Sequence, residues 1–178
     1  MEGESLATKS RWPIVEKFFP VVVDDFFREP EAIVNWGKQL PKEVVNKGLG
    51  TFLGQLTKTY IFASTGQEIK KFSLISAWVV SQYQGEYNPS HWHDGHISGA
   101  GYLKLPKSFG KNVQKNKAQN YNGHINFIHG SRQFLSKSIQ TVKPDIGNIY
   151  LFPNYLMHSV NPFYGEGERR SLSFNAFK

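Results

Sequence analysis

The sequence contains no cysteine, so it can form neither a disulfide bond nor a thiolate metal site. Any metal ion would have to be held by imidazole and carboxylate groups, and the absence of disulfides favours a reducing compartment. No apolar run approaches the length that spans a membrane, and residues 1–5 lack the pattern of a secretory signal. We therefore expect a cytoplasmic protein without a membrane partner.

Acidic residues are missing from one long stretch of the chain. Between Gly95 and Pro144 there is no Asp or Glu, although the stretch contains several Lys and Arg residues and the chain has a net charge of +7. A positive surface raises the rate of encounter with any anion, so an acidic peptide, a nucleic acid or an anionic small molecule could be attracted. A solvated lysine-rich loop or insertion at 106–122 is the alternative interpretation, because that segment has little apolar periodicity.

Large apolar side chains are abundant, with 39% hydrophobic and 15% aromatic residues in a chain of 178. This composition predicts one folded domain over 1–178, with a flexible segment at 1–11. Helical signals follow Pro30 and recur at 43–47, and β signals follow along the chain. The predicted strands are 18–23, 57–62, 72–83, 97–105, 123–128, 148–152 and 171–177. This order predicts a mainly β fold with N-terminal helices, a double-layered barrel or jelly roll.

Three of the six histidines lie within residues 91–96. If a strand begins at His91, the side chains of His91 and His93 point the same way and converge on one point. His158 could add a third imidazole and leave coordination positions open, as non-haem iron requires. Asp94 is the alternative second ligand, because two histidines and one carboxylate are the usual set, and a bulge would be needed to turn it inward.

Several motifs in the second half of the chain, taken together, resemble one enzyme family. They run over 83–93, with Asn-Pro-Ser-His-Trp-His at its end, and over 97–103, 144–153, 158–162 and 169–175. They look like the Fe(II)/2-oxoglutarate-dependent oxygenases, and most resemble the small branch that is found in bacteria and phages and related to prolyl 4-hydroxylases. The resemblance implies a double-stranded β-helix, the cupin-like jelly roll, and a cytoplasmic location in a bacterium or phage-infected host.

The resemblance also implies the cofactors and their ligands. The cofactors would be Fe(II), 2-oxoglutarate as cosubstrate and O2, with ascorbate as a candidate reductant. The metal ligands would be His91, His93 and His158, with His93 standing where most of the superfamily has Asp. A basic residue downstream of the distal histidine would bind 2-oxoglutarate.

Strand alternation selects between the two candidate arginines. Arg169 shares a strand face with Ser171 and Ser173, which suits a polar cavity, whereas Arg170 shares the other face with the apolar Leu172. We therefore predict that Arg169 binds the distal carboxylate of 2-oxoglutarate through two hydrogen bonds, and that Arg170 is a surface charge. The hydroxyl of Tyr102 could donate to the same carboxylate, although an aromatic residue in a barrel is as readily explained by core packing.

The activity that the resemblance implies is hydroxylation of a peptidyl, prolyl-like residue or a small amino acid, with release of succinate and CO2. A nucleic-acid-directed oxygenase is a less favoured alternative. The second alternative is a metal-binding β-barrel module without catalytic activity. The predicted partner is thus a peptide or small-molecule substrate, and the sequence contains no signal for an oligomeric state.

Overall fold

The structure is a computed structural model that describes residues 21–23, 48–132, 134 and 137–178. The predicted helices after Pro30 and at 43–47, and the predicted flexible segment 1–11, lie outside these residues. The described elements are β1 (Val21–Val23), α3 (Gly50–Thr65), β2 (Ser73–Gln82), β3 (Asn88–His91), β4 (Ile97–Lys104), β5 (Ile125–Ile128), β6 (Ile139–Val142), β7 (Ile149–Pro153), β8 (Met157–Val160) and β9 (Arg169–Phe177).

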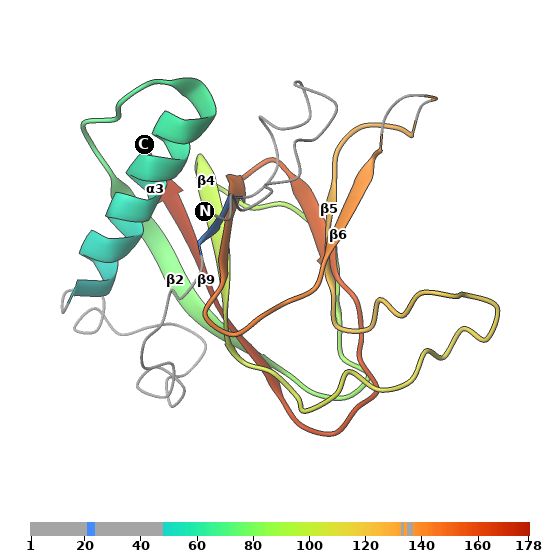
Figure 1. Cartoon of the computed structure of the whole chain (residues 1–178). Helices are drawn as coiled ribbons and strands as arrows, with labels where there is room; N and C mark the ends of the chain where they lie inside the picture. The colour runs from blue at the N-terminus through green and yellow to red at the C-terminus, as the bar shows by residue number, and fades with distance from the viewer. Residues whose placement is uncertain (1–20, 24–47, 133, 135–136) are drawn as a thin grey trace, which may run out of the picture.

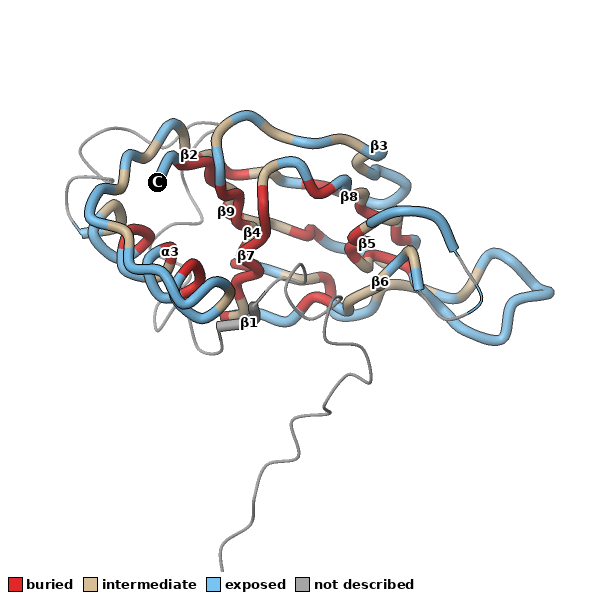
Figure 2. The backbone as a smooth tube through the Cα atoms, turned by 90° about the horizontal axis from the view of Figure 1, so that it is seen from above, coloured by how far each residue is buried: buried red, intermediate tan, exposed pale blue. Residues whose placement is uncertain are grey.

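The strands form two antiparallel sheets, with the order β1-β7-β4-β9-β2 in one and β3-β8-β5-β6 in the other. α3 lies against the five-stranded sheet, on the side away from β5 and β6 (Figure 1). Viewed from above, the most deeply buried backbone runs through β4, β7 and β9, between the helix and the second sheet (Figure 2). The predicted mainly β jelly-roll architecture is confirmed, although the two sheets do not close into a barrel.

The five-stranded sheet buries a different apolar cluster on each face. The face under α3 carries Ala77, Val79, Ile97, Leu103, Ile149, Leu151, Leu172, Phe174 and Ala176, together with Leu53, Tyr60 and Ile61 of the helix. The space between the sheets holds a second cluster of Tyr102, Ile125, Phe127, Tyr150, Phe152, Leu156 and Val160. Neighbouring residues of β7 divide between the clusters, because successive side chains of a strand point to opposite faces.

The segment 57–62, which we expected to be a strand, lies inside α3. Its Thr and Tyr content favours a strand, but the buried residues Leu53, Thr57, Tyr60 and Ile61 recur at helical spacing and form one face. Burying that face against the sheet outweighs a β propensity that spans only about 1 kcal/mol. The helix ends at Thr65, and the φ of 71° at the following Gly66 lets its N–H donate to the carbonyl of Phe62.

The turn before β3 is confined to the residues around Gly85, because Asn88 and Pro89 lie within the strand. Pro89 is tolerated there because β3 is an edge strand. None of the helices in the described part of the chain is long and apolar enough to cross a membrane.

The start of β9 is fixed by a buried carboxylate. Glu168 is 5% exposed and accepts hydrogen bonds from Arg170 Nε at 2.7 Å, from Arg170 Nη2 at 2.9 Å and from Lys104 Nζ at 3.2 Å. Burial alone would raise the pKa of Glu168, but the hydrogen bonds from Arg170, Ser81 and Lys104 together lower it below the usual 4.5. The carboxylate therefore ties the start of β9 to the ends of β2 and β4.

Replacement of Leu172, which is fully buried beneath α3, tests the helix-side cluster. Leu172→Ala should lower the free energy of unfolding by about 2–5 kcal/mol, because it removes buried apolar contacts and leaves a cavity. Urea denaturation followed by circular dichroism measures this change. Ile139→Ala on the edge strand β6, where the side chain is 52% exposed, is the matched control and should cost only about 0.5 kcal/mol. Equal losses would contradict the assignment of the core.

Replacement of the buried carboxylate should give a pH-dependent loss of stability. Glu168→Gln should lower the free energy of unfolding by roughly 1–3 kcal/mol at pH 7, because charge-assisted hydrogen bonds are lost. The folded pKa of Glu168 lies below its unfolded value, so this stabilisation is fully present above pH 4.5 and disappears as the pH falls through the folded pKa. Urea titrations of both proteins between pH 7 and pH 3 should therefore converge. A difference that stays constant with pH would contradict this account.

Candidate active site

The turns after β3 and β7 hold the histidine-rich segment in place. His91 is the last residue of β3 and lies opposite His158 of β8 in the register. His93 follows the strand, and its N–H donates to the carbonyl of Asn154 at 3.1 Å while the Asn154 amide donates to the carbonyl of His93 at 3.0 Å. His91 is the last residue of β3, and not the first residue of a strand as the alternation hypothesis supposed. The irregular backbone after it, rather than strand alternation, brings His93 to the same point.

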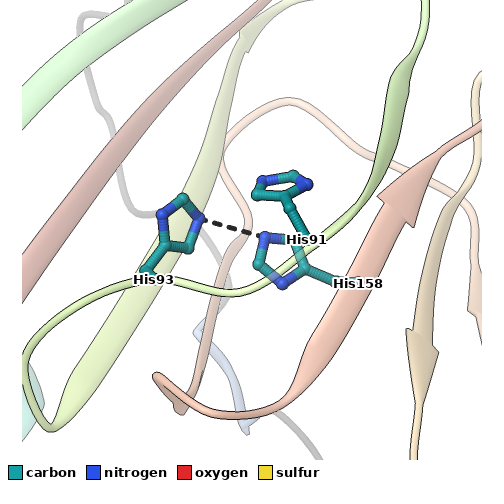
Figure 3. Close-up of side chains that lie close together, drawn as sticks. All are labelled: His91, His93 and His158. Carbon is teal, nitrogen blue, oxygen red and sulfur yellow. Dashed lines mark hydrogen bonds between the residues drawn. The ribbon is translucent and has the colours of Figure 1, made fainter.

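The three imidazoles of His91, His93 and His158 converge (Figure 3). Their ring centroids are 4.3 Å apart for His91 and His158, and 4.9 Å apart for each of the other two pairs. Nε2 of His93 lies 3.1 Å from Nε2 of His158. One nitrogen from each ring can be chosen so that all three lie within 4.8 Å of one another, a spacing that suits a shared metal ion.

Backbone carbonyls select the tautomer of two of these rings. Nδ1 of His91 lies 2.7 Å from the carbonyl oxygen of Pro89, and Nδ1 of His158 lies 3.0 Å from that of Leu156. A carbonyl oxygen can only accept, so each Nδ1 carries the proton in the neutral ring. Nε2 of each ring then keeps its lone pair, which is the arrangement that outer hydrogen bonds impose on metal-binding histidines.

Burial keeps His93 and His158 uncharged at neutral pH. Desolvation, assisted by the neighbouring His91, lowers the pKa of each to about 4. Phe152 and Phe127 contribute to that desolvation, with ring centroids 4.8 Å and 6.4 Å from the ring of His158. At pH 7 these imidazoles are therefore neutral donors, ready to bind a cation without first losing a proton.

Asp94 is not part of this cluster. It is exposed to solvent, and among the described residues the group able to hold a metal consists of the three histidines alone. His96 is also exposed, and its Nδ1 accepts a hydrogen bond from the backbone N–H of Lys178 at 3.2 Å. The structure thus brings together His91, His93 and His158 from the sequence candidates and leaves Asp94 outside.

The histidines share one cavity with the predicted cosubstrate residues. This cavity encloses about 60 Å³ between the two sheets. It is lined by Trp78, Val80, Gln82, Asn88, His91, His93, Ala100, Tyr102, Ile125, His158, Val160, Arg169, Ser171 and Ser173. As the alternation of β9 predicts, Arg169 and the two serines face the cavity, whereas Leu172 and Phe174 face the helix.

Arg169 is buried without a carboxylate partner among the described residues. Its side chain is 2% exposed, Nη1 donates to the carbonyl of Gly123 at 3.0 Å, and Nη2 donates to the side-chain oxygen of Gln82. Nε has no hydrogen-bond partner in the described part of the chain. Burial lowers the pKa of Arg169, while Tyr102 acts in the opposite direction. Such a guanidinium has unused capacity for an anion.

Tyr102 and Arg170 have different surroundings. Tyr102 is 2% exposed, lines the cavity and also packs edge-on against Tyr150, with ring centroids 6.0 Å apart. Burial raises the pKa of Tyr102, so its hydroxyl keeps its proton and can donate. Arg170 does not line the cavity, and it is half-buried in its ion pair with Glu168.

Gln82 is a cavity residue that the sequence prediction missed. It is the last residue of β2, it is 5% exposed, and it lies opposite Arg169 in the β2–β9 register. The signal that could have found it is the alternation of β2, which places Trp78, Val80 and Gln82 on one face. A polar residue that continues an apolar strand face is a candidate partner for a buried charge.

Comparison with known proteins gives one family and several similar folds. A family model described as "Putative 2OG-Fe(II) oxygenase" matches residues 76–175, which include all three histidines and both arginines. No curated protein matches the chain.

Solved structures of oxygenases resemble the fold. The viral collagen prolyl hydroxylase of Paramecium bursaria Chlorella virus-1, in its 2-oxoglutarate complex, has a TM-score of 0.59 at 16% identity over 88% of this chain and 94% of that one. HygX of Streptomyces hygroscopicus, with nickel and 2-oxoglutarate bound, has a TM-score of 0.57 at 12% identity over 92% and 83%. An oxidoreductase of the 2OG-Fe(II) oxygenase family from Burkholderia pseudomallei has a TM-score of 0.51 at 14% identity over 88% and 63%.

The TM-scores show a shared fold, and the family match covers more than half of the chain. The fold brings three imidazoles that could hold a metal ion and a buried arginine into one cavity. The chain belongs to the 2-oxoglutarate- and Fe(II)-dependent oxygenase family and is an enzyme that uses Fe(II), 2-oxoglutarate and O2.

Proposed function

We propose that this oxygenase hydroxylates a peptidyl, prolyl-like residue or a small amino acid, with His91, His93 and His158 as its iron ligands. Arg169 and Tyr102 bind the distal carboxylate of 2-oxoglutarate. The observation that carries the proposal is that the neutral imidazoles and a buried guanidinium without a described carboxylate partner line one cavity. The imidazoles of such a cavity suit a cation, and its guanidinium suits one carboxylate of a dicarboxylate.

The donor set fits Fe(II). Neutral imidazole is a suitable ligand for iron, and three protein ligands leave further coordination positions for small molecules. Without a metal, Nε2 of His93 and Nε2 of His158 are close enough to share one proton at 3.1 Å. To bind a cation through both Nε2 atoms, the neutral ring of His93 carries its proton on Nδ1 instead, which is a change of tautomer and not the loss of a proton. Because the pKa of each ring is about 4, neither ring carries the additional proton of an imidazolium at neutral pH.

Arg169 and Tyr102 fit a carboxylate. The free Nε–H of Arg169 and the protonated hydroxyl of Tyr102 are both donors, and a carboxylate oxygen can only accept. Ser171 and Ser173 line the same wall and offer further hydroxyl donors. Charge-assisted hydrogen bonds of this kind are about twice as strong as neutral ones, and they strengthen where water is excluded.

When bound, Fe(II) activates dioxygen with oxidative decarboxylation of 2-oxoglutarate to succinate and CO2, which is chemistry that no side chain supplies. The side chains of the cavity bind, orient and exclude water. Phe127 and Phe152 form an apolar wall behind His158, and the backbone carbonyls of Pro89 and Leu156 fix two of the rings. None of these residues needs to act as a general acid or base.

A peptide substrate would approach from outside, because the proposed ligands line a space between the two sheets. It would present one residue at the opening of that space. Trp92 lies between His91 and His93 in the sequence, and its side chain is 65% exposed. Its ring is therefore available to stack on an incoming side chain. The similar fold of a collagen prolyl hydroxylase makes a peptidyl prolyl residue the first substrate to test.

Ligand replacements test the metal assignment. His91→Ala and His158→Ala should each weaken Fe(II) binding by more than about 100-fold, because loss of outer hydrogen bonds alone costs 10–100-fold. Asp94→Ala should bind Fe(II) as the wild type does, since Asp94 is exposed and outside the cluster. Anaerobic titration calorimetry measures each affinity. Loss of binding in Asp94→Ala with retention in His93→Ala would replace His93 by Asp94 in the ligand set.

A coupled assay tests the reaction. With Fe(II), 2-oxoglutarate, ascorbate and O2, the enzyme should form succinate in proportion to a prolyl peptide or amino acid that gains one oxygen atom in mass spectrometry. Turnover confined to oligonucleotides would assign the nucleic-acid-directed activity instead. No succinate with any substrate would leave only a metal-binding module.

Replacement of the two arginines tests the cosubstrate site. Arg169→Ala should weaken 2-oxoglutarate binding far more than Arg170→Ala, because only Arg169 lines the cavity.

A further inference from the structure

Two consecutive arginines at the start of β9 are held by different kinds of partner. Arg170 donates from Nε and Nη2 to the carboxylate of Glu168, at 2.7 Å and 2.9 Å. Arg169 donates to the amide oxygen of Gln82 and to the backbone carbonyl of Gly123. Both guanidinium groups are largely removed from water, so the difference lies in the charge of the partner.

The charge of the partner decides what a buried guanidinium can still bind. A carboxylate partner neutralises the positive charge of the arginine, so an incoming anion would have to compete with that carboxylate. A carbonyl oxygen orients the guanidinium through hydrogen bonds but carries no net charge. Arg169 is therefore fixed in position with its positive charge uncompensated by any described carboxylate, and its Nε–H is free of partners in that part of the chain.

The orientation of Gln82 is itself fixed by a third strand. Its Nε2 donates to Oδ1 of Asn88 at 3.1 Å. Because an amide has one donor end and one acceptor end, this bond turns the oxygen of Gln82 toward Arg169. Asn88 begins β3, the strand that ends at His91. A chain of two side-chain hydrogen bonds thus connects Arg169 to the strand that carries the first proposed metal ligand.

We propose that Gln82 is the positioning residue for the cosubstrate anchor: it holds Arg169 in place without neutralising it, and so makes the cavity select 2-oxo acids with a second carboxylate. This inference rests on the proposed role of Arg169 in binding 2-oxoglutarate. The discriminating group is the neutral amide, because a glutamate of the same shape would place a carboxylate where the amide oxygen lies.

The test compares two ligands that differ only at the distal end. 2-Oxopentanoate has a methyl group where 2-oxoglutarate has its second carboxylate. Binding of each to the Fe(II)-loaded protein is measured by titration calorimetry without oxygen. In Gln82→Glu the affinity for 2-oxoglutarate should fall by at least about tenfold, the size of one charge-assisted hydrogen bond. The affinities for 2-oxopentanoate and for Fe(II) should stay within about twofold of the wild type.

Two further variants separate charge from orientation. Gln82→Leu removes the hydrogen bond but leaves Arg169 charged, so its loss of 2-oxoglutarate affinity should be clearly smaller than that of Gln82→Glu. Equal losses would overturn the role of neutrality. Asn88→Ala frees the amide of Gln82 to rotate and should weaken 2-oxoglutarate several-fold with no effect on 2-oxopentanoate. If circular dichroism shows that Gln82→Glu does not fold, Asn88→Ala serves as the test. An unchanged preference of Asn88→Ala for 2-oxoglutarate over 2-oxopentanoate would then overturn the inference.

Glu168→Gln is the matched control, since it changes the partner of Arg170, which does not line the cavity. It should keep the wild-type preference for 2-oxoglutarate over 2-oxopentanoate. A wild type that binds the two ligands equally well would refute the anchor role of Arg169 and hence the proposed binding mode. A wild type that prefers 2-oxoglutarate, with the same preference in Gln82→Glu, would overturn only the role of Gln82.

Discussion

Strands β4, β7 and β9 of the five-stranded sheet each face two different environments, because the cluster under α3 lies on one face and the space between the two sheets lies on the other. In β9 the alternation sends Leu172 and Phe174 under the helix, and Arg169 and Ser171 into the cavity. A shift of one residue in register would expose the apolar set and bury the charge against the helix, at a cost of several kcal/mol for the charge alone. The site therefore depends on the helix-side core, which fixes the register.

The sequence predicted the parts of the site that follow from alternation or from clustering of one residue type. Arg169 could be chosen over Arg170 because the two faces of β9 differ so clearly in polarity. The convergence of His93 could not be derived correctly, since it depends on the turn hydrogen bonds to Asn154 and not on a strand. The segment 57–62 was mispredicted because its local β propensity carries no information about the sheet that α3 packs against.

The charges of the cavity explain why its two proposed ligands would bind together. Imidazoles bind a metal ion in their neutral form, so a bound Fe(II) would keep both of its positive charges, and Arg169 adds a third in the same cavity. A dianion that spans the cavity offsets most of this total. Coulombic attraction is strong where water is excluded, so each ligand stabilises the other across the cavity. Because Gln82 is neutral, the positive charge of Arg169 stays available to interact with the dianion.

The lysine-rich segment 106–122 also contributes to this arrangement through its backbone. The amide of Asn122 donates to the carbonyls of Phe109 and Lys111, at 3.2 Å and 3.0 Å, and so folds the loop onto itself. The segment leads directly into Gly123, whose carbonyl accepts from Nη1 of Arg169. Gly123 has a φ of 70°, and a Cβ there would lie 2.3 Å from the ring of Phe109, so only glycine brings that carbonyl to the guanidinium. The loop thus helps to orient the anchor, independently of any attraction of anions by its lysines.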